Sequence, residues 1–114
     1  MLVKLFTAAV NGLDVRTVEA EVNISKGAKF SLVGLPDSAV RESYYRIKTA
    51  LHNSGFVLPT NQITINLAPA DIRKEGSGYD LPLSLGILAA QGSVDSNSLK
   101  RYMFVGELGL DGTL

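Results

Sequence analysis

The residues best suited to chemistry lie in one stretch, Lys74-Glu75-Gly76-Ser77-Gly78, which precedes an apolar segment. Glycines before a helix can bring backbone N–H groups to an anion. A nucleotide-hydrolysing loop needs the spacing G-x-x-x-x-G-K-[ST], and the chain contains no such sequence. We therefore interpret the stretch as a structural loop, with a weak anion site as the alternative. Asp80 is expected to occupy the helix end that such an anion would need.

Metal chemistry has few candidate ligands in this chain. Asp71, Glu75 and Asp80 are close in sequence, and a magnesium ion can bind through one or two carboxylates. Helix capping and loop ion pairs are the interpretation that their spacing favours. His52 is the only histidine and lies near an expected helix end, where a partly charged imidazole suits the helix dipole. We assign no catalytic residue and no metal ligand.

Composition limits the classes of protein that the chain can represent. Apolar residues make up 46% of its 114 residues and charged residues 19%, which is typical of one ordered core. Eleven basic residues balance eleven acidic ones, so a long-range field for binding nucleic acid is missing, and any such contact must be local or shared among subunits. The chain has no cysteine, and its longest strongly apolar stretch is too short to span a bilayer. A cytoplasmic protein is expected.

The pattern of apolar residues predicts strands in a run, then helix, strand, helix and strand. Strands are expected at 2–9, 16–24, 29–33, 62–67 and 102–105, with a turn at Asn11-Gly12. A first helix opens at Pro36-Asp37, with Asp37 capping it, and stops at Gly55. The order predicts an α/β domain of two layers (α+β), with a mixed sheet and helices packed on one side.

The second helix is expected to be the core helix. It starts near Asp80 and Pro82 and is apolar nearly all round, which places it against the sheet. Gly86 would permit a close approach of this helix to the sheet, and Gly92 would end it. Residues 107–113 resemble a turn into a further strand for which no residues follow, so we expect a single domain, 1–114, that is cut at its carboxyl end.

Three blocks of sequence resemble the ComM/YifB family of magnesium-chelatase-like AAA+ ATPases. The blocks are Val33-Gly34-Leu35-Pro36-Asp37-Ser38-Ala39-Val40-Arg41-Glu42-Ser43 with Asn53-Ser54-Gly55-Phe56, then Ile65-Asn66-Leu67-Ala68-Pro69-Ala70-Asp71-Ile72-Arg73-Lys74-Glu75-Gly76 with Tyr79-Asp80-Leu81-Pro82-Leu83, and Gly106-Glu107-Leu108 with Leu110 and Gly112. They follow one another in the order of the family. The second block is the most specific, and it makes Asp71, Glu75, Gly76 and Asp80 residues of the family motif.

The resemblance implies an amino-terminal domain with the fold of the Lon proteolytic domain, which is similar to the second domain of ribosomal protein S-five. That fold includes a left-handed βαβ crossover, which pattern alone would not predict. The resemblance also implies a separate AAA+ ATPase domain that would use ATP and magnesium, with no cofactor in these residues. Family members are thought to form hexameric rings that move DNA branches in competence and transformation. The implied partners are DNA, the chain's own AAA+ domain and other copies in the ring, with no membrane.

Cationic side chains are the candidates for contact with DNA. Arg41, Arg46 and Lys48 are expected on the exposed part of the first helix, and Arg73 and Lys74 on the loop. Clusters of this kind usually face solvent. In a ring, however, loop cations repeated around a pore could together hold phosphates. Arg73 and Lys74 are the leading candidates, followed by Arg41 and Arg46.

Two other functions are weighed against this one. The chain could be an interaction module that orders the ring or recruits a partner without touching DNA. It could also be a Ser-Lys peptidase, because residues 74–86 resemble the Lon stretch that presents the catalytic serine. Ser77 would be the nucleophile, but the spacing differs and the lysine of Lon follows later than Leu114. We therefore expect no catalysis from these residues.

Overall fold

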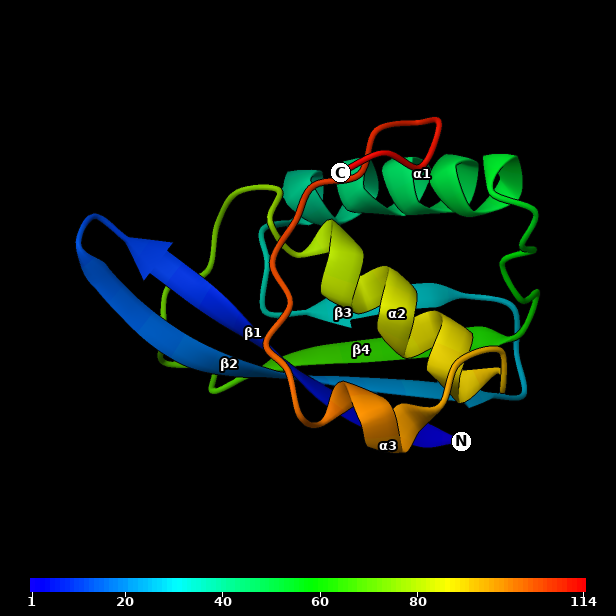
Figure 1. Cartoon of the computed structure of the whole chain (residues 1–114), viewed down its shortest axis with the longest axis horizontal. Helices are drawn as coiled ribbons and strands as arrows, with labels where there is room; N and C mark the ends of the chain where they lie inside the picture. The colour runs from blue at the N-terminus through cyan, green and yellow to red at the C-terminus, as the bar shows by residue number, and fades with distance from the viewer.

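Four strands form one mixed sheet, and helices cover one of its faces (Figure 1). The computed structural model describes all residues 1–114. Its elements are β1 (Leu2–Asn11), β2 (Asp14–Ser25), β3 (Phe30–Val33), α1 (Asp37–Asn53), β4 (Gln62–Ala68), α2 (Asp80–Ala90) and α3 (Ser96–Leu99). The strand order is β1-β2-β4-β3, with β3 parallel to β4 and the other pairs antiparallel. The predicted two-layer α+β class with a mixed sheet is confirmed.

The β1–β2 hairpin follows from its turn and its alternating pattern. Gly12 has a φ of 63°, which an Asn-Gly turn supplies at low cost, and Asn11 pairs with Asp14 across the turn. This register sets Val3 opposite Val22. Since side chains alternate between the two faces of a strand, one face of the hairpin is apolar and buried under the helices.

The connection from β3 through α1 to β4 is left-handed. In Figure 1 both strands run from right to left, β4 lies below β3, and the helices lie on the near face. Turned so that the strands point upward, β4 lies to the left of β3 with the helix toward the viewer. Contact between the rings of Phe30 and Tyr44 places α1 on this face. Parallel crossovers are almost always right-handed, so this one is rare.

The core lies between the sheet and α2, as predicted. Eighteen buried apolar residues form one cluster, and Leu83 and Ile87 of α2 are fully enclosed in it. Gly86 faces β1 and β2, because a Cβ built there would lie 2.6 Å from Val22 Cγ2. The expected close approach is therefore confirmed. No helix combines the length and the apolar character needed to cross a membrane.

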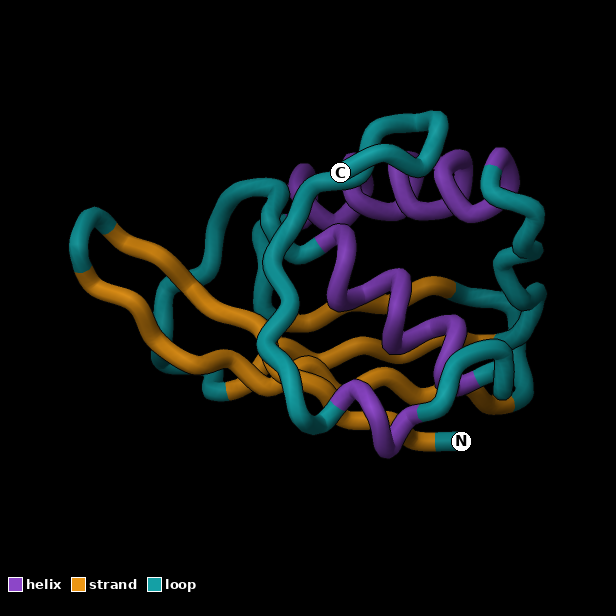
Figure 2. The backbone as a smooth tube through the Cα atoms, in the orientation of Figure 1, coloured by secondary structure: helices purple, strands orange, loops and turns teal.

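The predicted strand at 102–105 is wrong. Only Met103 bridges to Phe6 of β1, and the N–H of Phe104 donates to the carbonyl of Phe6 at 3.0 Å. Two residues later the backbone of Gly106 bonds instead to Gly78 and Leu81. The chain therefore leaves the sheet and runs past the start of α2 to α1 (Figure 2).

Two further details differ from the prediction. Asp37 does not cap α1, because the residue at the cap position is Pro36 and no side chain bonds to the free N–H groups. The short helix α3 was not expected from the sequence. Asp95 caps α3 by accepting a hydrogen bond from the N–H of Asn97 at 3.1 Å.

Candidate functional site

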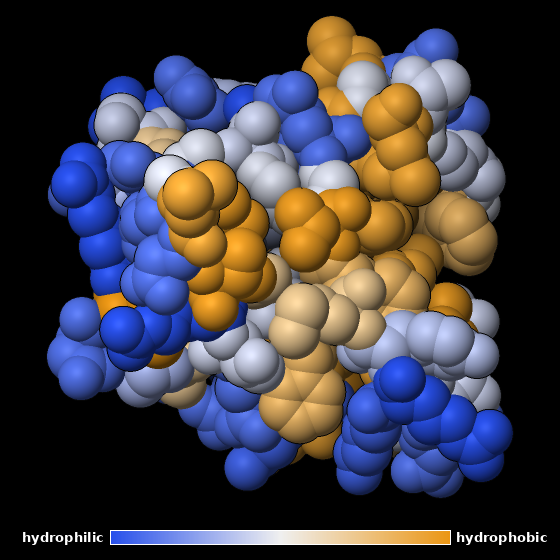
Figure 3. Space-filling view, turned by 60° about the vertical axis from the view of Figure 1, so that its left-hand side comes forward, coloured by the Kyte–Doolittle hydropathy of each residue, from blue (hydrophilic) through white to orange (hydrophobic).

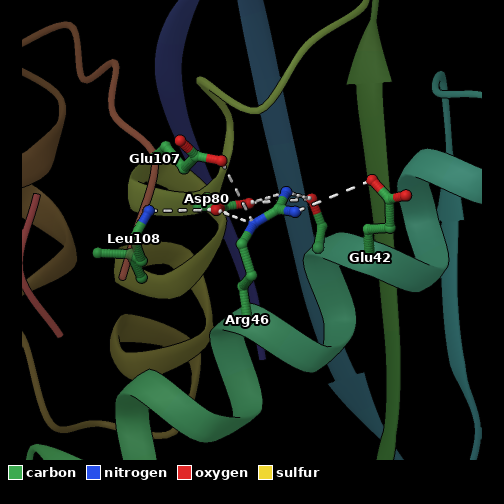
Figure 4. Close-up of polar contacts among 6 residues, drawn as sticks. Glu42, Arg46, Asp80, Glu107 and Leu108 are labelled. Atoms are coloured by element: carbon green, nitrogen blue, oxygen red, sulfur yellow. Dashed lines mark hydrogen bonds and ion pairs between the residues drawn. The ribbon is translucent and has the colours of Figure 1, made fainter. Parts of the chain in front are cut away.

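A buried carboxylate, Asp80, joins three segments of the chain (Figure 4). Its Oδ1 accepts hydrogen bonds from Ser43 Oγ at 2.9 Å and Arg46 Nη2 at 3.1 Å. Its Oδ2 accepts from Arg46 Nε at 2.6 Å and from the backbone N–H of Leu108 at 3.1 Å. Asp80 itself is fully buried. We name Ser43, Arg46, Asp80 and Leu108 the Asp80 junction.

The elements position these groups through simple spacing. Ser43 and Arg46 are three residues apart on α1 and so share one face of the helix. Asp80 is the first residue of α2, but its carboxylate turns toward α1 and does not cap α2, which corrects the sequence prediction. In this orientation the carboxylate accepts two charge-assisted hydrogen bonds from the guanidinium of Arg46.

The electrostatics of the Asp80 junction favour a permanent ion pair. The hydrogen bond from Arg46 to Asp80 is the main cause that raises the pKa of Arg46, and the charges of Asp80, Glu107 and Glu42 add to it. Glu42 and Glu107 each lie 4.0 Å from the guanidinium and are mostly exposed. All four hydrogen bonds to Asp80 come from within the chain, so the carboxylate connects α1, α2 and the segment at Leu108.

The three sequence blocks meet at this junction. Ser43 belongs to the first block, Asp80 to the second and Leu108 to the third. Arg46 lies outside the blocks, and its partner could not be found from sequence because Asp80 is 34 residues away. The expectation that Arg46 is exposed is wrong, since only 22% of its side chain reaches solvent.

Lys74 is also not the exposed loop cation that the sequence predicts. It is 6% exposed, and its Nζ donates to the carbonyls of Pro69 at 2.7 Å and Ile72 at 2.8 Å. Gly34 leaves room for it, because a Cβ there would lie 3.1 Å from Lys74 Cε. The ammonium group holds the loop together, where two carbonyls would otherwise lack partners.

The neighbouring motif residues are at the surface. Arg73 donates to Glu75 at 2.9 Å, and these side chains are 77% and 55% exposed. Asp71 is exposed too, and Gly76 is exposed with a φ of 87° that favours glycine. Burial, with the nearby charge of Glu75 in addition, raises the pKa of Tyr79. The loop therefore offers one exposed cation, Arg73, which is already paired.

Replacing Lys74 with Met should destabilise the chain by about 1.5 kcal/mol, because two loop carbonyls lose a charged donor. Replacing its neighbour Arg73 with Ala removes an equal charge from an exposed ion pair and should cost below about 0.5 kcal/mol. Urea unfolding followed by circular dichroism measures both variants. If Lys74→Met lowered the free energy of unfolding as little as Arg73→Ala is expected to, the hydrogen bonds of Lys74 would not stabilise the loop.

A polar hollow of about 330 Å³ surrounds Ser77. Its lining consists of Ser38, Ala39, Glu42, Arg46, Gly76, Ser77 and Glu107. No lysine lines it, and its one cation, Arg46, is held by Asp80. A serine nucleophile needs an adjacent base with a free lone pair, which a guanidinium does not supply.

Possible metal ligands are scattered. His52 is exposed on the last turn of α1. No group of three or more His, Asp or Glu side chains is close enough together to hold a metal ion. The acidic residues Asp71, Glu75 and Asp80 do not converge, because Glu75 pairs with Arg73 and Asp80 with Arg46.

Comparison with known proteins gives consistent matches. The family described as subunit ChlI of Mg-chelatase matches residues 19–114. The competence protein ComM of Haemophilus influenzae is 45% identical over 111 residues, which is 96% of this chain and 22% of that protein. The protein YifB of Escherichia coli is 46% identical over 109 residues, 95% of this chain and 22% of YifB. The protein Rv2897c of Mycobacterium tuberculosis is 41% identical over 110 residues, again 96% and 22%. The chain thus spans about a fifth of the length of these relatives.

Proposed function

Because the chain belongs to the magnesium-chelatase-like family that includes ComM and YifB, we propose that it is the amino-terminal domain of an ATP-dependent DNA motor. In this proposal the domain is not an enzyme and helps a cytoplasmic, hexameric motor to hold DNA during branch migration. ATP and magnesium act in the motor domain. The name of the relative ComM, a competence protein, supports the setting of DNA uptake.

A Lon-type fold is part of the proposal. It is supported by the left-handed β3–α1–β4 crossover, because few folds contain one. The position of Ser77 just before α2 also agrees with that fold.

The Asp80 junction is the observation that supports a mechanical role. It fastens α1, α2 and the segment at Leu108 to one buried carboxylate, so that a load on one segment reaches the others. Of the four cations that the sequence proposes for DNA, Lys74 is buried and Arg46 is partly buried, and both are bound to groups of the protein itself. Arg41 is exposed and outside every ion pair, and Arg73 is exposed beside Glu75. DNA contact is therefore proposed for Arg41 and Arg73.

Deleting residues 1–114 from the full-length protein should weaken its binding to DNA several-fold while the motor still forms rings and hydrolyses ATP. Titration of labelled DNA, with sedimentation to measure ring formation, tests this. Unchanged DNA affinity in correctly assembled rings would contradict the proposal.

An interaction module is the second candidate, and exposed apolar side chains favour it. Figure 3 shows apolar surface gathered on one face of the molecule. Four apolar side chains are each about half exposed or more: Met103, Val105, Leu110 and Leu114. Apolar patches on a surface commonly mark contacts with other proteins. The same deletion would then reduce the fraction of protein in rings and leave the DNA affinity of the remaining rings unchanged.

A further inference from the structure

A groove runs between the edge strand β3 and helix α1. It consists of two adjoining hollows of about 330 and 410 Å³, which share Ala28, Lys29, Phe30 and Tyr44. Hollows of this size are large enough to take in a small ring system. We name the surface formed by Lys29, Phe30, Arg41, Tyr44 and Lys48 the β3–α1 groove.

Aromatic rings form the floor of the β3–α1 groove. Phe30 and Tyr44 have ring centroids 4.9 Å apart at an interplanar angle of 54°, and both side chains are only half-buried. Lys48 Nζ lies 5.8 Å from the centroid of the Tyr44 ring. Both rings keep part of their surface exposed, and a flat, uncharged group that covered the Tyr44 ring would take the place of Lys48 there.

The rim of the groove is positively charged. Lys29, Arg41 and Lys48 are exposed, and Asp37 is the one acidic residue that lines the two hollows. The ion pairs of the chain use Lys4, Arg16, Arg46 and Arg73, so the three groove cations are unpaired. In a chain whose net charge is zero, this excess is local. A groove that joins half-exposed rings to cations outside every ion pair is complementary to unpaired bases on a phosphate backbone.

We propose that the β3–α1 groove binds single-stranded nucleic acid, with a base against Tyr44 and phosphates held by Lys29 and Lys48. The proposal rests on the proposed role in a DNA motor and gives it a site. A duplex fits less well, because its bases are stacked inside and cannot reach the rings. An added peptide strand fits less well too, because β3 has only four residues and cations at an edge oppose strand pairing.

The test compares charge-matched variants of the full-length protein. Lys29→Gln with Lys48→Gln removes two cations from the groove, and Lys100→Gln with Arg101→Gln removes two exposed cations near α3, which packs on β1 at the opposite edge of the sheet. Fluorescence anisotropy with an oligo-dT strand gives the affinity at several salt concentrations. The groove pair should lower the slope of log affinity against log salt by about 1.4 for each engaged domain, at roughly 0.7 per phosphate contact. The control pair should leave the slope unchanged.

The contribution of the Tyr44 ring is tested by a separate measurement of affinity for single strands. Tyr44→Leu keeps an apolar side chain in the packing but removes the ring, and should weaken binding to single strands about tenfold with little change in the salt slope. Photocrosslinking to a 5-iodouracil strand should label the peptide that contains Tyr44. Equal effects of the two charge pairs, or crosslinks only elsewhere, would overturn the groove site.

A third comparison separates the two proposals. If deletion of residues 1–114 weakens DNA binding while the groove variants do not, the groove is wrong and the proposed function stands. If the deletion has no effect either, both fail. Weaker binding of an acidic peptide in the groove variants, with oligo-dT binding intact, would assign the groove to a protein partner and also overturn the inference.

Discussion

Replacing Asp80 with Ala is expected to cost the chain about 3–5 kcal/mol of its free energy of unfolding, the range for breaking a buried ion pair. The change leaves the guanidinium of Arg46, which is 22% exposed, without its partner and the N–H of Leu108 without an acceptor. Domains of this size are stable by roughly 5–15 kcal/mol, so the variant should lose a large part of its stability. Urea unfolding, compared at equal slopes, measures the loss.

Two comparisons make this prediction specific to the Asp80 junction. Glu107→Gln removes an acidic group that lies 4.0 Å from Arg46 but is 58% exposed, and should change stability by less than about 0.5 kcal/mol. Asp80→Leu combined with Arg46→Met removes both charges, and should recover part of the loss because neither charge is then buried alone. A loss below about 1 kcal/mol in Asp80→Ala would mean that the junction contributes little.

The sequence predicts those parts of the fold that depend on local pattern. Alternation along residues 62–67 and the Asn11-Gly12 turn predict their strands because side-chain period and turn geometry are local properties. The strand predicted at 102–105 fails because pairing there competes with bonds from Gly106 to Gly78 and Leu81, which are distant in sequence. Strand formers do not reveal such competition.

The candidate site also depends on contacts between residues distant in sequence, which local pattern does not predict. Lys74 and Arg46 are charged residues in polar stretches, so pattern places them in solvent, yet their partners at Pro69, Ile72 and Asp80 hold them inside. The apolar run in α2 is one signal, because a carboxylate that begins a largely buried helix needs a partner. The β3–α1 groove gave no signal, because it depends on how α1 lies over an edge strand.

Gly86 should tolerate no branched side chain, and Gly86→Val is expected to cost about 3 kcal/mol or more, since overpacked cores strain both side chains and backbone. A Cβ at Gly86 would already lie 2.6 Å from Val22 Cγ2 and 3.1 Å from Leu5 Cδ2, and the stiff Val22 has little freedom to move. Gly86→Ala should therefore cost about 1–2 kcal/mol, even though Ala favours a helix over Gly by about 1 kcal/mol.

The sign of the Gly86→Ala effect should reverse when Val22 is shortened. In a Val22→Ala background the nearest methyl group is gone, which leaves the Cβ of residue 22 at 3.3 Å and the flexible end of Leu5 at 3.1 Å. Gly86→Ala should then be neutral or stabilise by up to about 1 kcal/mol through helix propensity. Thermal and urea unfolding of the four proteins in this cycle give the coupling energy directly. The same penalty in both backgrounds would show that the approach of α2 to β2 does not explain why this helix carries a glycine at its centre.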